Sequence, residues 1–319
     1  MVRSVRLRCI SWKVTQNLKT LPLATLPAKP PVARFKLAVL VGFHALCFLA
    51  AIPYCFTWWG IPIVLIGNAI FGSIGINLGY HRLLTHRSVT VPRWLEKTFV
   101  VCGICSLEGP PLKWVAVHRM HHQHSDDDGD PHSPVPDFYW GHVGWVYTAD
   151  APRGKSGGPE RYIMDLISDP FQKWLHKRNR WAKVYFAHLV VILVLAFGLG
   201  WAITGEFEQA VQITVQAFVW GIVVRTVYVW HITWLVNSAS HRWGYRNYET
   251  NDMSRNNWLV ALLTNGEGWH NNHHAAPSAA AHGHRWWEID LTYSFIRLLE
   301  VCRLAKQVVP VKVASYKVK

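Results

Sequence analysis

Histidines are concentrated in three short segments of this 319-residue chain, HRLLTH, HRMHH and HNNHH. Their eight histidines are His81, His86, His118, His121, His122, His270, His273 and His274. A spacing of i, i+3, i+4 places three imidazoles on one face of a helix, close enough to ligate shared metal ions. Two such triads predict a site for two metals. Imidazoles without thiolates favour a borderline transition metal over calcium or magnesium.

The first segment differs from the other two, because His81 and His86 are five residues apart. On an α-helix this separation turns the two side chains about 140° apart. Either the helix frays between them, or the two ligands approach the metals from different sides. Asp126 and Asp130, which follow the second segment, are candidates to orient ligating imidazoles. Five further histidines are left out of the ligand set: His124, His132, His142, His282 and His284.

The composition places these segments in a membrane protein. The chain is 50% hydrophobic and only 16% charged, which is too apolar for an ordinary soluble domain. No Asp, Glu, Lys or Arg occurs between Lys36 and Arg82, enough for two spans of about 20 residues each. A second pair is predicted at 184–205 and 210–236, interrupted by Arg225 and His231. We therefore expect an all-α fold with four transmembrane helices in two hairpins and a helical cap that holds the two-metal site.

The distribution of basic residues orients the spans. The turns inside the two hairpins, at 57–62 and 204–209, contain no Lys or Arg, although the chain carries a net charge of +14. The positive-inside rule then places both termini and the histidine segments on the cytoplasmic side or its topological equivalent. Topology accounts for the basic excess, so a nucleic-acid partner is not expected. The mixture of aromatic and basic residues at 169–186 is typical of a helix in the membrane interface. Arg225, inside a span, must face the protein interior or extend to the interface.

Three regions follow from this pattern. Residues 1–34 form a basic arm without acidic residues, which we expect to be disordered, although its composition also fits a targeting peptide. Residues 35–310 form the membrane domain, and 311–319 form a basic tail. The six cysteines show no disulfide framework.

The stretches GYHRLLTHRS, HRMHHQHSD and GEGWHNNHHAAP resemble the three histidine boxes of the integral-membrane fatty acid desaturases. The resemblance runs from about residue 35 to about residue 310 and is closest to the delta-9 acyl-desaturase branch, which includes the stearoyl-CoA desaturases. DPHSP, WGHVGW, NSASHRWGYRNYET and EIDLTY resemble most the cyanobacterial and plastid acyl-lipid members.

The resemblance implies a site of two iron ions that uses O2 as co-substrate. Such an enzyme introduces a cis double bond, at the delta-9 position in this branch, into a saturated acyl chain of a lipid or acyl thioester. Side chains alone cannot break an unactivated C–H bond, so a cofactor must supply that chemistry. The resemblance also implies a ninth ligand, His241 in the NSASH segment, with Asn237 one turn earlier holding a metal-bound water.

The electrons must come from a separate donor, because the sequence contains no His-Pro-Gly-Gly haem motif. By resemblance this donor is ferredoxin in a cyanobacterial or plastid setting and cytochrome b5 in the endoplasmic reticulum. Two other functions compete with desaturation. A di-iron membrane acyl hydroxylase would use the same histidines. A non-enzymatic histidine-rich metal or haem membrane protein would need paired ligands deep within the spans, whereas these histidines follow the spans.

Overall fold

The computed structural model describes residues 30–148 and 159–313. In these ranges the chain is helical, with isolated β-bridges in place of strands. Four helices are long and apolar enough to cross a membrane, at Arg34–Ala51, Gly60–Thr85, Pro170–Thr204 and Phe207–His241. The all-α, four-span prediction is therefore confirmed. Residues 1–29 of the arm predicted at 1–34 lie outside the described residues, and so do residues 314–319 of the tail predicted at 311–319.

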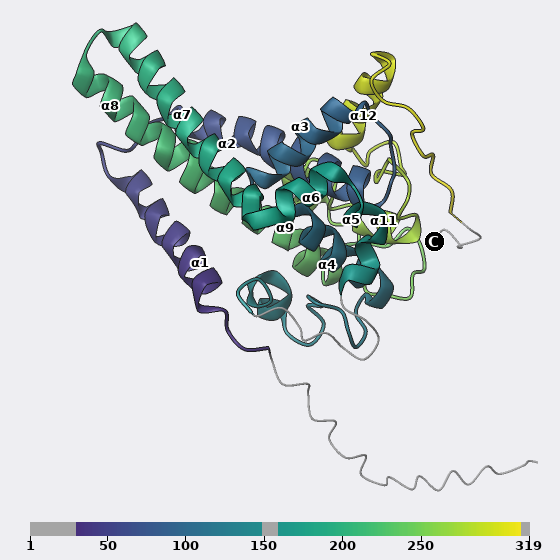
Figure 1. Ribbon diagram of the computed structural model, residues 1–319. Coiled ribbons are helices and arrows are strands. Elements are labelled where there is room, and N and C mark those ends of the chain that lie inside the picture. The colour runs from purple at the N-terminus through teal and green to yellow at the C-terminus, as the bar shows by residue number, and fades with distance from the viewer. Residues whose placement is uncertain (1–29, 149–158, 314–319) are drawn as a thin grey trace, which may run out of the picture.

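Each span is built from more than one helical segment. The first consists of α1 (Arg34–Cys47) and the 3-10 segment η1 (Phe48–Ala51), and the second of α2 (Gly60–Gly67) and the π-helical segment η2 (Asn68–Thr85). The third comprises α6 (Pro170–His176), η5 (Lys177–Asn179) and α7 (Arg180–Thr204). The fourth comprises α8 (Phe207–Gln216), the π-helical η6 (Ala217–Val224), α9 (Arg225–Ser238) and η7 (Ala239–His241). Figure 1 shows α7 and α8 side by side as the second hairpin.

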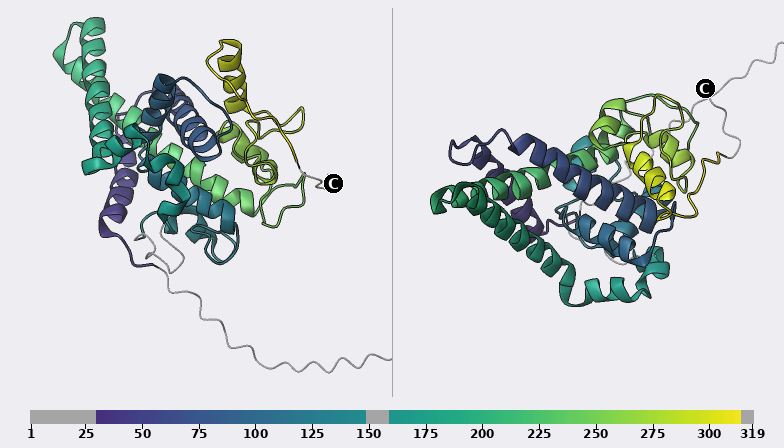
Figure 2. Two further views of the ribbon diagram at one scale, coloured as in Figure 1. Left: turned by 45° about the vertical axis from the view of Figure 1, so that its right-hand side comes forward. Right: turned by 90° about the horizontal axis from the view of Figure 1, so that it is seen from above.

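The remaining helices form the cap, which together with the end of η2 holds the three histidine segments (Figure 2). In chain order they are α3 (Arg93–Ile104), α4 (Pro111–His124), η3 (Trp140–Gly144), η4 (Pro159–Ile163), α5 (Met164–Ile167), α10 (Trp258–Leu263), α11 (His270–Ala275) and α12 (Leu291–Val301). The sequence predicted one interfacial helix at 169–186, but the structure divides this segment between α6 and α7. Arg178 and Asn179 have φ of 55° and 51°, and two successive left-handed residues separate α6 from α7.

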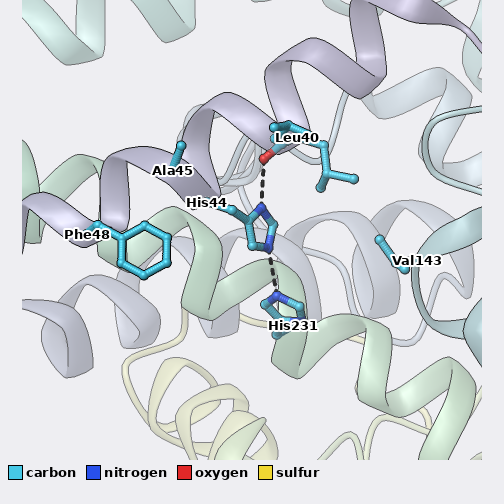
Figure 3. Close-up of a pocket in the computed structure, with 7 residues that line it drawn as sticks. Leu40, His44, Ala45, Phe48, Val143 and His231 are labelled. Atoms are coloured by element: carbon cyan, nitrogen blue, oxygen red, sulfur yellow. Dashed lines mark hydrogen bonds between the residues drawn. The ribbon is translucent and has the colours of Figure 1, made fainter.

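The α1 helix is attached to the rest of the protein by a chain of histidines. Leu40 is its only buried residue. His44 lies with Nδ1 2.7 Å from the Leu40 carbonyl oxygen and Nε2 2.9 Å from His231 Nε2 (Figure 3). His231 Nδ1 in turn lies 3.0 Å from His142 Nε2 on η3. Within a bilayer these polar groups must be paired inside the protein, so the chain connects α1, α9 and η3.

Arg225 faces the protein interior, the first of the two placements expected for it. The side chain has no exposed surface. Its Nη1 donates to the Cys105 carbonyl at 2.6 Å and its Nε to the Gly221 carbonyl at 3.0 Å, and its Nη2 lies 3.2 Å from His188 Nε2 on α7. The fourth span is thereby connected to α7 and to the end of α3.

The α3 helix runs back along η2, and glycines permit this close approach. A Cβ atom added at Gly75 would lie 2.5 Å from the backbone nitrogen of Gly103, and one added at Gly79 would lie 2.9 Å from the Phe99 carbonyl oxygen. Backbone atoms cannot move away as a flexible side chain can. This helix pair contributes much of the main apolar core, with Ile76, Leu84 and Ile104 fully buried.

Replacing Gly75 with Val should therefore push α3 away from η2. We expect a loss of at least about 1–3 kcal/mol in stability, the usual cost of overpacking a core, measured as a lower midpoint of thermal unfolding in detergent. Gly42→Val is the matched control, because a Cβ at Gly42 meets nothing within 4 Å. Equal effects of the two substitutions would contradict the proposed contact.

Candidate metal centre

The structure brings together all nine histidines that the sequence analysis selected. They form two groups, each with ligand atoms within 4.8 Å of one another. One group has five members, His81, His86, His118, His122 and His273, and the other has four, His121, His241, His270 and His274. These residues come from η2 and its end, α4, η7 and α11, elements far apart in the sequence.

The π-helical form of η2 corrects the expectation for the first segment. A π-helix closes each turn with a hydrogen bond between residues i and i+5, and the His86 amide donates to the His81 carbonyl at 3.1 Å. The two rings consequently lie 4.7 Å apart, centroid to centroid. His81 and His86 therefore join one group. The sequence left open whether the helix frays or the two ligands approach from different sides, and it did not predict a π-helix.

The helices α4 and α11 each supply both groups. His118 and His122, one turn apart on α4, join the five-histidine group, whereas His121 joins the four-histidine group. On α11 the division is reversed, because His270 and His274 join the four-histidine group and His273 the other. The two groups are adjacent, since the His122 ring stacks on the His274 ring at 4.5 Å.

Carboxylates orient the imidazoles of both groups. The Nδ1 atoms of His121 and His241 lie 3.0 Å and 2.7 Å from the carboxylates of Asp130 and Asp126, as the sequence predicted. An Nδ1–H donated to a carboxylate leaves Nε2 free to ligate a metal. The Nε2 atoms of His86, His121 and His274 are buried without a hydrogen-bond partner. This donor set fits a pair of transition-metal ions.

Two orienting carboxylates were missed from the sequence. His274 Nδ1 lies 2.6 Å from Asp252, and His81 Nδ1 lies 2.7 Å from Glu267. Glu267 stands three residues before His270, so its nearness to the third segment was a usable signal. Asp252 is 22 residues from His274, and no spacing rule connects the two.

Electrostatics keep several of these imidazoles neutral, as metal binding requires, whereas at His121 the adjacent Asp130 outweighs burial and raises the pKa. Burial lowers the pKa of His118, His122, His270 and His273 well below the usual range, and neighbouring imidazoles lower it further. Burial alone would raise the pKa of Asp252, but His274 together with hydrogen bonds from Ser254 and Thr250 outweighs burial, and the net shift is downward. Neutral imidazoles beside ionised carboxylates are the ligand state for a divalent metal.

A buried arginine supports Glu267. Arg82 has no exposed surface and donates to Glu267 at 2.7 Å, to Asp290 at 2.9 Å and to the Ala280 carbonyl at 2.7 Å. Glu267 in turn bonds His81. Arg82 therefore helps to position His81 through Glu267, without a direct hydrogen bond to the imidazole.

Two of the histidines left out of the ligand set lie against the groups. His282 forms a close cluster with His81 and Glu267, and His132 forms one with His121 and Asp130. Their exclusion as ligands remains a prediction. His142 bonds Ser238 and His231, and His284 bonds Tyr248. Asn237 is half-buried one turn before His241, and its role also remains a prediction.

Comparison with known proteins decides the family. Residues 56–297 match the sequence model of the fatty acid desaturases. This chain belongs to the fatty acid desaturase family. The resemblance inferred from the three histidine segments is thereby confirmed.

The relatives of this desaturase-family chain include enzymes with different substrates. It is 40% identical over 285 residues to an sn-1 stearoyl-lipid 9-desaturase of Anabaena variabilis, covering 88% of this chain and 95% of the relative. It is 41% identical over 281 residues to an sn-2 palmitoyl-lipid 9-desaturase of Nostoc sp. (strain 36), covering 88% and 91%. An acyl-CoA C20 Delta5-desaturase of Anemone leveillei is 39% identical over 274 residues, covering 86% and 81%.

Replacing Asp252 with Asn should weaken metal binding by this desaturase-family chain without removing a ligand. We expect metal affinity to fall by about 10- to 100-fold, the usual effect of losing a carboxylate that orients a ligating histidine, measured by competition with a chelator. Asp128→Asn is the matched control, because Asp128 is exposed in the acidic run after α4. Unchanged affinity in the Asp252 variant would contradict an orienting role.

Proposed function

We propose that this chain is an oxygen-dependent acyl desaturase that introduces a cis double bond, at the delta-9 position, into a saturated acyl chain of a membrane lipid. The observation that carries the proposal is the pair of adjacent all-imidazole groups on the cap, in a member of the desaturase family. Its relatives from Anabaena variabilis and Nostoc sp. act on lipid-linked chains. An acyl thioester is the alternative substrate, as in the Anemone relative.

The nine histidines would hold two iron ions, one in each group. Iron bound there would supply the oxidant needed to break unactivated C–H bonds with O2. The residues of the chain hold and orient the metal. Carboxylates fix the imidazole tautomers, and the buried surroundings exclude bulk water. We further propose that Asn237 holds a metal-bound water beside the four-histidine group, which has one protein ligand fewer than its neighbour.

The chain must also receive electrons. Removing two hydrogens from an acyl chain while one O2 becomes two waters consumes two electrons and two protons. We propose that a separate protein, ferredoxin or cytochrome b5, delivers the electrons. The absence of Lys and Arg from the two hairpin turns supports a cytoplasmic or stromal location for the termini and the metal centre.

Expression in a desaturase-deficient host tests the proposed reaction. Gas chromatography with mass spectrometry of the host lipids should show new cis-monoenoic chains, with the double bond at the ninth carbon. Hydroxylated chains in their place would establish the alternative di-iron hydroxylase. The absence of any new acyl product, with the protein in the membrane and iron bound, would contradict both enzymatic functions.

The ninth ligand is tested in the same host. His241→Ala should lose iron and double-bond formation together, whereas Asn237→Ala should retain iron and lose part of the activity. His124→Ala is the matched control, because His124 belongs to neither group. A His241 variant with both irons and undiminished turnover would refute its role as a ligand.

A further inference from the structure

Two stretches beyond the fourth span expose large apolar side chains. On α10 these are Trp258, Leu259 and Leu262, and the most exposed ones between residues 286 and 291 are Trp286, Ile289 and Leu291. The exposed fractions reach 91% for Trp286 and 66% for both Leu262 and Ile289. We call these six residues the C-terminal apolar surface.

The arrangement of polarity in these stretches is the reverse of that in a water-soluble protein. Glu288 and Asp290, which alternate with the exposed apolar residues, are buried at 4% and 6% exposure. They bond inward, Glu288 with Asn247 and Asp290 with Arg82. Charged residues in water-soluble domains are almost always exposed, and large apolar patches on their surfaces mark interaction sites.

The same pattern occurs on α10 and matches the lipid-facing part of the third span. No charged residue occurs from 256 to 266. On α10 the smaller Val260 and Ala261 point inward while Leu262 points outward. Leu195, in the middle of α7, is likewise 66% exposed. The exposed side chains of α10 are therefore large and apolar, like those on the lipid-facing surface of a membrane span.

Hydrogen bonds place these stretches beside the second span. Asn77 donates from Nδ2 to the Thr264 carbonyl at 2.6 Å, and Asn265 donates from Nδ2 to Ser73 Oγ at 2.5 Å. The Thr292 amide donates to the Asn265 carbonyl at 3.0 Å, which joins the two stretches. Ser73 lies 13 residues after Gly60, where the span begins. That is at most about 20 Å along the span, the length these residues would have in an α-helix, and less than the bilayer's hydrocarbon thickness of about 30 Å.

We propose that the C-terminal apolar surface is embedded in the bilayer and faces the acyl chains of membrane lipids. The cap is then a part of the protein that enters the lipid from one side, beside the second span, without crossing it. Trp286 and Trp287, with Arg285 lying 5.2 Å from the Trp287 ring centroid, fit the headgroup boundary, where Trp and basic residues are enriched. The inference does not depend on the proposed activity.

The embedding has a consequence for substrate access. The α11 helix lies between the two stretches in sequence, and Trp269, directly before it, donates from Nε1 to the Ile289 carbonyl at 2.8 Å. α11 carries three of the nine clustered histidines. An acyl chain that contacts the C-terminal apolar surface therefore lies beside the helix that supplies both metal groups, without having left the membrane.

Spin labelling tests the proposal. Leu262→Cys and Ile289→Cys, each in a background without the native cysteines, are labelled with a nitroxide and reconstituted in phosphatidylcholine–phosphatidylglycerol liposomes. Collision rates with O2, which partitions into lipid, and with a water-soluble nickel chelate are then compared. Leu195→Cys on α7 is the lipid reference, and Asp128→Cys in the acidic run is the water reference.

We expect both labels to show an oxygen-to-nickel accessibility ratio like that of Leu195→Cys and far above that of Asp128→Cys. A ratio like that of Asp128→Cys would overturn the proposal by showing a water-exposed surface. Low accessibility to both reagents would overturn it too, by showing that protein covers the surface, such as a second copy of this chain.

Discussion

Replacing any one of the nine clustered histidines with alanine is expected to abolish double-bond formation in a desaturase-deficient host. Each imidazole in these groups is buried or nearly so. Each would supply a metal ligand, and a water molecule in its place could not bind the metal with the same geometry. Because losing even an orienting carboxylate costs about 10- to 100-fold, losing a ligand should cost more than that. Product analysis of host lipids, together with iron content of the purified protein, measures the effect.

Each group should lose its own iron ion when one of its ligands is removed. His86→Ala affects the five-histidine group, and His270→Ala affects the four-histidine group. We expect each to lower the iron bound from two ions toward one, with activity lost in both. The control is His284→Ala, since His284 bonds Tyr248 and belongs to neither group. Full activity after removal of any single member would exclude that residue from the centre.

The largest loss of stability is expected from Arg82→Met. This substitution leaves Glu267 and Asp290 buried without their guanidinium. Removing one partner of a buried ion pair usually costs about 3–5 kcal/mol, because the remaining charge is uncompensated. Thermal unfolding in detergent should show a much lower midpoint, and iron binding should weaken as Glu267 releases His81.

Arg87→Met is the matched control for this experiment. Arg87 also pairs with a carboxylate, that of Asp165, but both side chains are close to half exposed. Exposed pairs contribute about 0–1 kcal/mol, so the control should unfold close to the unchanged protein. If the two variants unfolded at the same temperature, the buried network would not hold the cap together.

Much of the centre could be predicted from the sequence because helical spacing is a local property. The triads at His118 and His270 fix which imidazoles share a face, and absence of charge marks the spans. The division into five and four ligands could not be predicted, since it depends on how α4 and α11 face each other. The roles of Asp252 and Arg82 were missed for the same reason, because their partners are distant in sequence and only packing brings them together. Glu267 offered one local signal, its position three residues before His270, but its contact with His81 also depends on packing.

The π-helical geometry of η2 was also beyond local prediction. Spacing rules assume an α-helix, which would separate His81 from His86. In the tertiary structure, Gly75 and Gly79 face α3 while His81 and His86 face the other histidines. One wider helix meets both requirements.

That geometry limits how the first histidine segment can change in length during evolution. Deleting one residue between His81 and His86 would leave the two histidines one α-helical turn apart, still on a common face. The part of η2 before the deletion, which carries Gly75, Gly79 and His81, would then rotate by about 100° relative to His86. Either the glycines could face α3 or His86 could face its group, but not both. Insertions and deletions in this segment should therefore be tolerated only with compensating changes along α3. We therefore expect the number of residues between the two histidines to change only together with the packing of η2 against α3.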